Sequence, residues 1–582
     1  MFKNKSLLGS YWELKNYDER LILSLSQQNQ ISPLLAKLLL ARNIKGDFVN
    51  NFLNPNVKLD FPNPFLLKDM KKSVNRVIKA IKNNENIGII ADYDVDGSTS
   101  ASILYKFLQN FSNKILLKIP NRLLEGYGPN MRILDEMIQN NINLIFTLDC
   151  GTSSHDIIDN IKYKNIDVII IDHHLSEPIL PKIYSIINPN RHDEKNDFKN
   201  MAAVGVTFLF LMALRQKLRE QKFFNKNIIE PNLLSYLDLV ALGTVCDVVD
   251  LTSYNRLFVK IGLGLIKQRK NINIAKIIDN SNLNSEPNSS DLGFIIGPQL
   301  NAASRLDDSS LPSKLLISDN IADIDSISKK LILLNEKRKL IEKNILDEAI
   351  TQAIKQNNQN FLLVYGIDWH KGVLGIVASR LMNKFHKPTI VISFMNSIGF
   401  GSARSIPSID LGNIILSAKN KNILINGGGH KMAAGLKINY TLLKKFSLFL
   451  TNIFDNLSND LFQKIETFDS DLSANEINYD LLDIIDQIEP FGSGNPEPKF
   501  IIKDFLISNV KILKDKHLLI FFQNDFSSNL RGICFNCLGT NLGDYLLNFK
   551  KHKLALGCTV KRNNFNNTSL PQIIIKDAML ID

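Results

Sequence analysis

Apolar runs that end in acidic or imidazole side chains constrain this chain more than any other feature. Residues 86–91, 144–148 and 167–171 have the composition of short buried strands, and aspartate or histidine follows each. A fourth run, residues 239–245, is expected to be a strand that ends in the same way. Because amphipathic stretches separate the runs, we predict a parallel sheet. Ligands of such sheets gather at the carboxyl ends of the strands.

The first run is followed by three aspartates, Asp92, Asp94 and Asp96, on alternate positions. A period of two predicts that their carboxylates leave the sheet on one side, with residues 97–99 opening a helix through a hydroxyl N-cap. Like charges this close are unfavourable unless cations lie between them, and oxygen ligands suit Mg²⁺ or Mn²⁺. A solvated acidic turn is the alternative.

The later runs are followed by Asp149, by Asp172, His173 and His174, and by Asp247. Taken singly, an aspartate here could cap a helix and a histidine could belong to an ordinary loop. As a set at neighbouring strand ends, they predict a metal site, since neutral imidazole and carboxylate together suit Mn²⁺ or a similar ion.

These residues resemble the DHH phosphoesterase superfamily, named for the Asp-His-His found here at 172–174. Further motifs, at 121–128, 297–305, 401–404 and 427–435, are similar to those of the RecJ family of bacterial exonucleases. The similarity runs from about Trp12 to the C-terminus. It implies an α/β fold with a two-lobed DHH phosphoesterase core, in which a parallel-sheet DHH domain and a DHHA1 domain are joined by a long helix. A C-terminal OB-fold β-barrel follows.

The expected domains follow from this resemblance and from the pattern of apolar runs and Gly/Pro-rich junctions. They are a mostly helical segment (1–80), a DHH catalytic domain (81–255), a helical region with the connecting helix (256–356), a DHHA1 substrate-binding domain (357–456) and an OB-fold domain (465–582). The connecting helix should be a rigid charged rod. Its apolar stripe is Leu334, Ile341, Ile345 and Ala349, with Lys337, Arg338, Glu342 and Lys343 outside the stripe.

The resemblance implies a single-stranded-DNA-specific 5′→3′ exonuclease of DNA recombination and repair that releases 5′-mononucleotides. Its cofactor would be two Mn²⁺ or Mg²⁺ ions. By resemblance Asp149 bridges the ions, Asp94, His173 and Asp247 complete one, and Asp92 helps to hold the other. Many superfamily members carry a histidine just before the first aspartate. Residues 90–91 are Ile and Ala here, which predicts weaker binding of one ion.

Several roles stay open on the sequence. Asp96 is a metal-ligand candidate that could instead order its turn. His174 could be a metal ligand, a group that supports the ligands, or a donor to the phosphate in the transition state. We favour a non-ligand role, because one strand end rarely directs two adjacent side chains at the same ion. Asp172 is expected to orient an imidazole through its free N–H.

Substrate contacts are expected from basic, aromatic and glycine residues of the other motifs. Arginine suits bidentate phosphate contacts, and glycine lets backbone N–H groups approach a phosphate. The candidates are Arg122, Tyr127, Arg305, Ser402, Arg404, Gly428, Gly429 and His430. The Lys550–Lys553 and Lys561–Arg562 clusters could face a nucleic-acid backbone, or could be solvated surface.

Composition agrees with a nucleic-acid partner, because the net charge is +11. The longest apolar runs fall short of the roughly 20 residues of a membrane span, the N-terminus lacks the features of a signal peptide, and five cysteines make no disulfide framework. We therefore predict a cytoplasmic monomer without membrane contact. Its expected partner is single-stranded DNA, with a single-strand-binding protein and a helicase as further candidates.

Two other functions fit part of the pattern. A nano-RNase, a cyclic-dinucleotide phosphodiesterase or a pyrophosphatase would share the two-lobed core without the barrel. A non-catalytic DHH scaffold would share the fold, but retention of Asp92, Asp94, Asp149, His173 and Asp247 argues against it.

Overall fold

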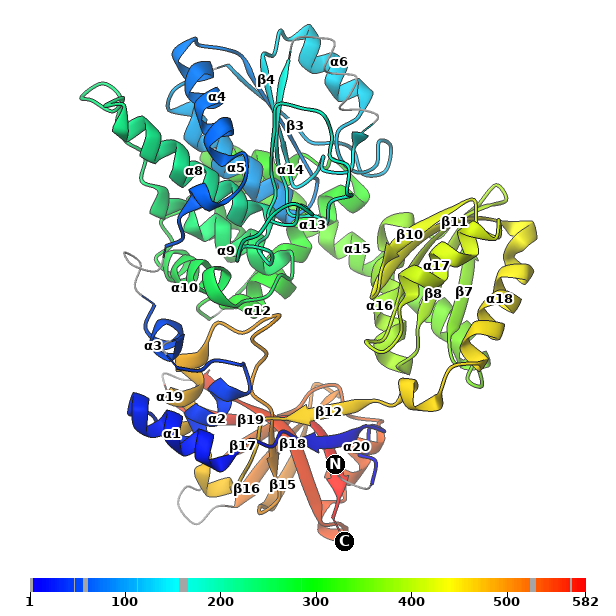
Figure 1. Cartoon of the computed structure of the whole chain (residues 1–582). Coiled ribbons are helices and arrows are strands. Elements are labelled where there is room, and N and C mark those ends of the chain that lie inside the picture. Colours follow the sequence, from blue (N-terminus) through cyan, green and yellow to red (C-terminus); the bar gives the residue numbers. More distant parts are fainter. Residues whose placement is uncertain are drawn as a thin grey trace. The chain divides into compact units, whose positions relative to one another are not determined.

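The computed structural model of the protein describes residues 4–46, 48–55, 61–112, 114–155, 166–283, 285–523, 530–565 and 568–581. These residues form two compact units, one built mainly from residues 333–466 and the other from residues 14–332 and 467–582. Figure 1 shows the elements of both units. Within the described residues, no helix combines the length and apolarity that a membrane span requires.

The site is positioned by a five-stranded parallel sheet of order β3-β2-β4-β5-β6. All residues of β2 (Ile87–Ala91) and β4 (Leu144–Leu148) are buried, as expected for a parallel sheet covered on both faces. The other strands are β3 (Ile115–Lys118), β5 (Asp167–Ile171) and β6 (Ser185–Ile187). The register pairs Ala91 with Leu148 and Leu148 with Ile171, so the last residues of β2, β4 and β5 lie side by side at the same edge of the sheet.

The structure corrects two expectations at this sheet. The fourth apolar run is not a strand but the buried helix α9 (Leu237–Cys246), because a short all-apolar run cannot distinguish a buried strand from a buried helix. The helix after β2, α5 (Val95–Gln109), begins earlier than predicted. Its N-cap is Asp94, whose side chain accepts a hydrogen bond from Gly97 N at 3.0 Å. The three aspartates therefore do not alternate along an extended strand, as the predicted period of two required.

Helices accompany the sheet in the part of this unit that precedes the barrel. They include α4 (Met70–Lys82), α6 (Met131–Gln139), α8 (Ala203–Glu220), α10 (Ser253–Lys267), α11 (Ile272–Asn280), α12 (Ser289–Asp291), α13 (Gly297–Leu306) and α14 (Leu311–Ile317).

The N-terminal segment is mostly helical, as predicted. It contains α1 (Glu19–Asn29), α2 (Pro33–Leu40), which Ser32 caps, and α3 (Phe48–Leu53). Its buried leucines join one apolar core with the C-terminal barrel, beside which these helices lie in Figure 1. In this segment the prediction missed the strand β1 (Tyr11–Leu14), which pairs with β12 (Ile465–Phe468), and β12 was not predicted either.

The long charged helix is present as α15 (Ile321–Lys355). Ile345 and Ala349 of the expected stripe are buried in the core of the second lobe. Arg338 and Glu342 were wrongly placed outside the stripe, because both are buried. They form an ion pair of 2.7 Å, and Arg380 also pairs with Glu342, so mutual neutralisation lets charged residues occupy a buried face.

The second lobe has a five-stranded sheet of order β10-β11-β9-β8-β7. The strands are β7 (Leu362–Ile367), β8 (Thr389–Met395), β9 (Ile398–Arg404), β10 (Asn426–His430) and β11 (Ala433–Asn439). The helices are α16 (Leu374–Phe385), α17 (Leu411–Asn420) and α18 (Leu443–Asp455).

The C-terminal part is a barrel of the predicted OB type. Its sheet order is β13-β14-β18-β19-β17-β16-β15, with β13 (Ser470–Leu472), β14 (Phe500–Ile502), β15 (Leu506–Leu513), β16 (His517–Gln523), β17 (Arg531–Cys534), β18 (Leu554–Phe565) and β19 (Thr568–Leu580). Because the consecutive strands β14 and β15 lie near opposite ends of this order, the sheet must curve strongly, as in a barrel. Helices α19 (Tyr479–Ile488) and α20 (Asn541–Leu547) flank the strands, of which β13 and β17 were not predicted.

Candidate metal centre and nucleic-acid surfaces

Backbone pairing places three predicted aspartates side by side at the carboxyl edge of the parallel sheet. Asp92 N donates to Leu148 O at 3.1 Å, Asp149 N to Ile171 O at 3.0 Å, and Asp172 N to Ile187 O at 3.1 Å. Each aspartate is therefore fixed by the neighbouring strand, and all three are nearly inaccessible to solvent. The sheet thus gathers the acidic residues as the sequence predicted.

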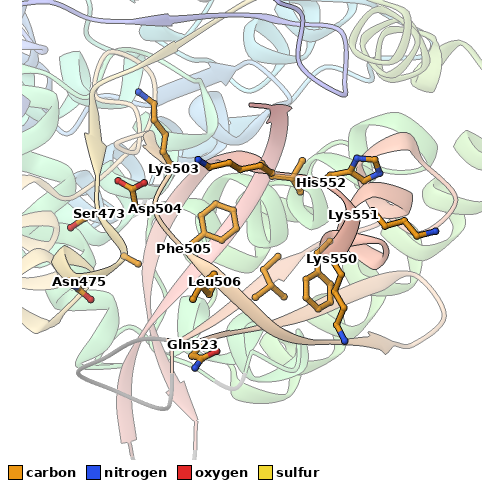
Figure 2. Close-up of a pocket in the computed structure, with 15 residues that line it drawn as sticks. Ser473, Asn475, Lys503, Asp504, Phe505, Leu506, Gln523, Lys550, Lys551 and His552 are labelled. Carbon is orange, nitrogen blue, oxygen red and sulfur yellow. The ribbon is translucent and has the colours of Figure 1, made fainter. Parts of the chain in front are cut away.

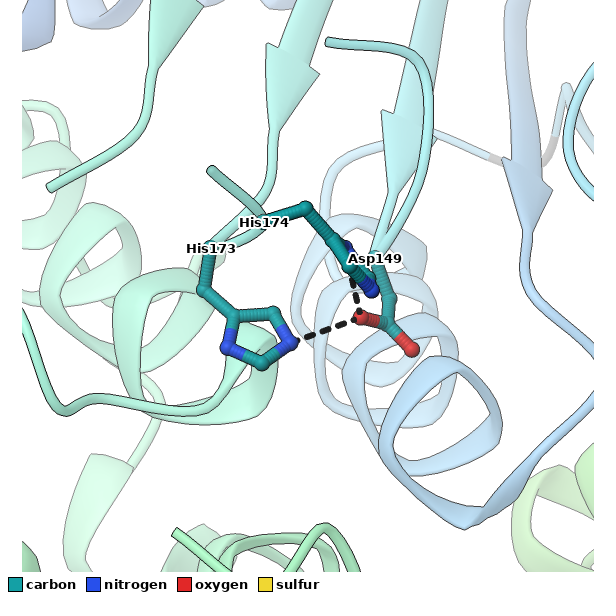
Figure 3. Close-up of side chains that lie close together, drawn as sticks. All are labelled: Asp149, His173 and His174. Carbon is teal, nitrogen blue, oxygen red and sulfur yellow. Dashed lines mark ion pairs between the residues drawn. The ribbon is translucent and has the colours of Figure 1, made fainter. Parts of the chain in front are cut away.

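The histidines after β5 face the same carboxylate. His173 Nε2 lies 3.3 Å from Asp149 Oδ1 and 3.5 Å from Asp247 Oδ2, and His174 Nδ1 lies 3.9 Å from Asp149 Oδ1. Figure 3 shows both imidazoles directed toward Asp149. The expectation that two adjacent side chains would not be directed at the same point was therefore wrong, because these residues follow the strand rather than extend it.

The potential ligand atoms fall into three overlapping groups. Asp92, Asp94 and Asp149 form one, Asp96, His173 and Asp247 form the second, and Asp149 with both histidines forms the third. Asp149 belongs to two groups, as a bridging carboxylate should. Asp94, which was expected beside His173 and Asp247, is grouped with Asp92 instead.

In the part of the chain that the structure describes, four buried ligand atoms have no hydrogen-bond partner, namely Asp92 Oδ1, Asp149 Oδ1, Asp247 Oδ2 and His173 Nε2. Buried polar atoms are normally paired, so an orphaned set that converges in space calls for a missing partner. Carboxylate oxygens and a neutral imidazole are the donors that Mn²⁺ and Mg²⁺ accept, although Mg²⁺ favours oxygen. The residues present fit a divalent-cation centre.

Besides facing the metal-ligand candidates, Asp96 binds the N-terminus of α8, a role that the sequence did not predict. Its two carboxylate oxygens accept hydrogen bonds from Ala203 N at 2.7 Å and Val204 N at 2.8 Å, at the start of α8. It is also 3.9 Å from His173 Nε2. The carboxylate therefore satisfies two amides of a helix N-terminus while it faces the metal-ligand set.

His173 is held as a neutral imidazole. It forms a hydrogen bond with the Met201 backbone, which leaves Nε2 directed at the carboxylates. Burial, helped by the neighbouring His174 charge, lowers the pKa of His173 to about 4. A neutral imidazole with one fixed nitrogen is the form that binds a metal.

Asp172 and His174 form a separate charged pair, in which Asp172 Oδ1 lies 2.7 Å from His174 Nδ1. Burial alone would raise the pKa of Asp172, but the hydrogen bonds from His174 and Thr152 hold it below its usual range. Burial alone would lower the pKa of His174, but Asp172 raises it to about 9. Asp172 thus orients an imidazole as predicted, and that imidazole belongs to His174.

The remaining carboxylates repel one another. Burial, followed by the charge of Asp94, raises the pKa of Asp92 to about 8. Burial, followed by the charge of Asp96, raises the pKa of Asp247 to about 9 and that of Asp149 well above its usual range. A cation would relieve this repulsion.

Aromatic and basic side chains border the centre. The Arg122 guanidinium lies 4.9 Å from the centroid of the Tyr93 ring, and the pKa of Tyr93, which burial raises to about 12, is also influenced by Arg305. Tyr127 Oη donates to the Asp149 carbonyl at 2.8 Å, which ties its hydroxyl to the backbone. Its ring remains half exposed beside His174.

Sequence reasoning missed three supporting residues. Tyr93 lies between two predicted site residues but carried no signal of its own. Asn188 Nδ2 donates to His174 O at 2.9 Å, and Asn190 Nδ2 donates to His173 O at 2.5 Å. Both asparagines follow β6, so the strand-end rule that found the aspartates could have found them.

In the second lobe, four predicted phosphate-binding residues share one face of the sheet. The register aligns Arg404, Ala433 and His430 in one row and Ser402, Gly435 and Gly428 in the next. Directly paired residues share a face, as do residues two apart on a strand. Arg404, His430, Ser402 and Gly428 therefore form a surface patch, the sheet-face patch.

The sheet-face patch has room for a ligand. A Cβ at Gly428 or Gly435 would meet nothing within 4 Å. Among the described residues, Arg404 forms hydrogen bonds with Ser402 Oγ at 3.4 Å and Ala403 O at 2.8 Å and takes part in no ion pair. Gly429, in contrast, has φ +153°, and a Cβ there would strike the β11 backbone, so this glycine serves the fold.

The barrel carries a basic pocket of about 980 Å³. Lys503, Lys550, Lys551 and Lys553 line it together with Phe505 and Phe549 (Figure 2). The first lysine cluster therefore faces a pocket. The second does not offer free charge, because Lys561 pairs with Glu497 at 3.0 Å and Arg562 with Asp483 and Asp486 at 2.9 and 2.7 Å.

Comparison with known proteins places the chain in a family. Models of the DHH family N-terminal domain, the DHHA1 domain and the RecJ OB domain match residues 86–244, 358–458 and 468–577. The single-stranded-DNA-specific exonuclease RecJ of Haemophilus influenzae is 34% identical over 575 residues, which cover 94% of this chain and 96% of that protein. The chain belongs to the RecJ family. RecJ of Escherichia coli is 34% identical over 484 residues, covering 81% and 84% of the two chains.

The RecJ fold is also found in solved structures. RecJ from Thermus thermophilus in complex with Mn²⁺ matches with a TM-score of 0.82 at 23% identity, covering 99% of this chain and 80% of that one. The same protein in complex with Mg²⁺ matches with a TM-score of 0.76 at 22% identity. These matches confirm the predicted fold, in which the DHH core, the DHHA1 lobe and the OB barrel occur together.

Proposed function

We propose that the protein is a metal-dependent exonuclease that degrades single-stranded DNA in the 5′→3′ direction and releases 5′-mononucleotides. The observation that carries the proposal is the convergence of orphaned carboxylate and imidazole atoms at one sheet edge. Membership of the RecJ family, whose curated relatives are named single-stranded-DNA-specific exonucleases, supports the substrate class.

In this proposal Asp92, Asp94, Asp149, His173 and Asp247 hold two divalent ions, Mn²⁺ or Mg²⁺, with Asp149 shared between them. Bound ions would neutralise the phosphate charge and lower the pKa of the attacking water. Asp96 adds a ligand or holds α8 in place, and its two hydrogen bonds to the helix favour the second role.

The residues around the ions would stabilise charge on the reacting phosphate. His174 is protonated at neutral pH, because its pKa is raised to about 9 by Asp172, which overcomes the effect of burial. Its Nδ1 is held by Asp172, so the other ring nitrogen is available to donate to a phosphate oxygen. Such a donor acts best in a site that excludes water.

The 5′ end would be recognised through the sheet-face patch. Arg404 has no carboxylate partner among the described residues, Ser402 offers a hydroxyl, and the open space over Gly428 would admit the phosphate. Gly429 and His430 continue the same strand. Near the ions, Arg122, Arg305 and Tyr127 would hold the strand by charge and stacking.

The OB barrel would hold the single strand away from the cut. Phe521 of β16 lies beneath Lys511 and Arg531, whose charged groups are 5.4 and 5.6 Å from the ring centroid. The β15–β17 surface of an OB fold is a common single-strand platform, and this ring with two cations fits it. The barrel also argues against the smaller DHH phosphodiesterases, which by the resemblance would have only the two-lobed core.

Digestion of end-labelled oligonucleotides tests the proposal. Single strands with and without a 5′-phosphate, and a blunt duplex as control, are incubated with Mn²⁺ or Mg²⁺. The expected result is stepwise release of mononucleotides from the 5′ end of the single strand only. Release from the 3′ end, or binding without metal-dependent cleavage, contradicts it. Equal activity of a chain that ends near residue 455 on long strands would favour a smaller DHH enzyme.

We also propose that the protein acts as a cytoplasmic monomer and meets a single-strand-binding protein and a helicase on its substrate. Sedimentation tests the monomer, and binding assays with each purified partner test the contacts.

A further inference from the structure

The loop between α19 and β14, residues 489–496, makes contacts that the proposed reaction does not use. It joins the barrel to the catalytic domain within one compact unit. Asn495 Nδ2 fixes its shape by donating to Ile488 O and Pro490 O, both at 2.8 Å. Gly492 and Asn495 are paired across the turn. We name this segment the clasp loop.

The clasp loop contacts the segment that follows the metal-ligand candidate Asp247. Ser493 Oγ donates to Asp250 Oδ1 at 2.7 Å, and Leu251 N donates to Ser493 O at 2.7 Å. Gly494 has φ +69°, and a Cβ there would lie 2.7 Å from the Asp250 side chain. The backbone of the clasp loop thus packs against the Asp250 side chain at a point that only glycine permits, three residues beyond Asp247.

The same segment is linked to the second metal-ligand candidate. Asn255 Nδ2 donates to Asp250 O at 2.9 Å and to Asn200 O at 2.6 Å. Met201, the next residue, holds the His173 ring by a backbone hydrogen bond. Asp250 is therefore linked to Asp247 through the backbone of three residues. It is linked to His173 by the hydrogen bonds of Asn255 to Asp250 and Asn200, followed by that of Met201 to the imidazole.

Both ends of the clasp loop are anchored. Arg256 Nη2 donates to Glu489 O at 2.6 Å, and Arg42 Nε donates to Asn495 Oδ1 at 2.6 Å. Val248, next to Asp247, has φ +62°, which is unfavourable for a β-branched residue and needs support from its surroundings. Asp250 and Leu251, which the clasp loop contacts, follow this residue closely in the chain.

We propose that the clasp loop positions Asp247 and His173, so that Ser493 and Gly494 of the barrel side set the affinity of the metal centre. This inference rests on the proposed metal site. It does not depend on the polarity of cleavage or on the DNA contacts of the barrel. Ser493 is a positioning residue, since it reaches the ligands only through Asp250.

The test measures binding of Mn²⁺ alone, by electron paramagnetic resonance of the free ion, to the full-length protein without DNA. Removing a group that orients metal ligands typically weakens metal binding about 10–100-fold, so we expect Ser493→Ala to raise the Mn²⁺ dissociation constant by about tenfold or more. Gly494→Ala should act in the same direction, and Ser493→Thr, which keeps the hydroxyl, should restore binding to within about threefold of the parent.

The matched control is Ser289→Ala. Ser289 Oγ donates to Phe491 O at 2.6 Å, so the variant removes a similar bond to the same loop without touching Asp250. Ser289→Ala should bind Mn²⁺ like the parent, and the KM for single-stranded DNA at saturating Mn²⁺ should be unchanged in Ser493→Ala.

Three outcomes overturn the inference. Parent-like Mn²⁺ binding by Ser493→Ala does so directly. An equal loss in Ser289→Ala means that the loop only stabilises the domain. If the parent protein itself binds no Mn²⁺, the proposed metal site is wrong and this inference is wrong with it. If the parent binds Mn²⁺ and Ser493→Ala binds it equally well, only this inference is wrong.

Discussion

Substitution of Asp96 by Asn separates its two candidate roles. Its carboxylate oxygens accept hydrogen bonds of 2.7 and 2.8 Å from the first amides of α8. Asparagine keeps one acceptor oxygen and presents an NH₂ group to the other amide, so one bond is lost. The remaining bond loses its charge.

The size of the effect follows from these contacts. A hydrogen bond to a charged group contributes about 1.5–3 kcal/mol, and a charge at a helix N-terminus about 0.3–1 kcal/mol. The sum, about 2–4 kcal/mol, should speed amide exchange at Ala203 and Val204 by about thirtyfold to several-hundredfold. Global stability is a poorer readout, because Asn also relieves the repulsion from Asp94 that helps to raise the pKa of Asp96 to about 7.

Hydrogen-exchange mass spectrometry is the assay, with peptides that begin several residues before α8 and span its first turn, at pH 8.5 and without metal, where the parent carboxylate is ionised. The control is Asp410→Asn at the exposed N-cap of α17, where asparagine caps as well as aspartate and no change is expected. Unchanged exchange at the start of α8, together with a tenfold loss of Mn²⁺ affinity, would refute the capping argument and assign Asp96 to the metal.

Three further predictions concern activity and binding. Asp149→Ala should abolish hydrolysis while single-stranded DNA still binds, and joint loss of both in a gel-shift and digestion series would point to misfolding. Arg404→Ala should weaken DNA binding about 10–100-fold and lower the slope of log affinity against log salt by about one; an unchanged slope removes Arg404 from the phosphate contacts. Burial and neighbouring charge raise the pKa values of Asp92 and Asp247 to about 8 and 9, so cations must displace protons there. Mn²⁺ affinity, measured by calorimetry, should therefore rise from pH 6 to pH 8.5 with proton release, and affinity independent of pH would contradict this.

The sequence predicted the elements whose patterns are local and unambiguous. Residues 144–148 and 167–171 are strands with those bounds, since their β-branched apolar runs are flanked by polar residues. The strand-end rule then brought together Asp92, Asp149 and Asp172, although other elements separate them in the sequence. The fourth run failed because α9 is buried on all sides and so carries no amphipathic period to separate helix from strand.

What the sequence could not supply were pairings set by tertiary contacts. Arg338 and Glu342 have the composition of a solvated face, yet each neutralises the other inside the second lobe. The hydrogen bond from Ser493 to Asp250 joins residues 243 positions apart, and no local sequence pattern near either residue predicts it. Asp94 was recognised as a ligand candidate, but its role as N-cap of α5 emerged only from the turn geometry.

The central claim is that Asp149 and its neighbours hold a pair of divalent ions. Titration of the full-length protein with Mn²⁺, followed by electron paramagnetic resonance, counts the bound ions and detects magnetic coupling between them. The account predicts two coupled ions per chain in the parent and loss of the coupled pair in Asp149→Ala. Two coupled ions retained by Asp149→Ala, or no more than one ion bound by the parent, would contradict it.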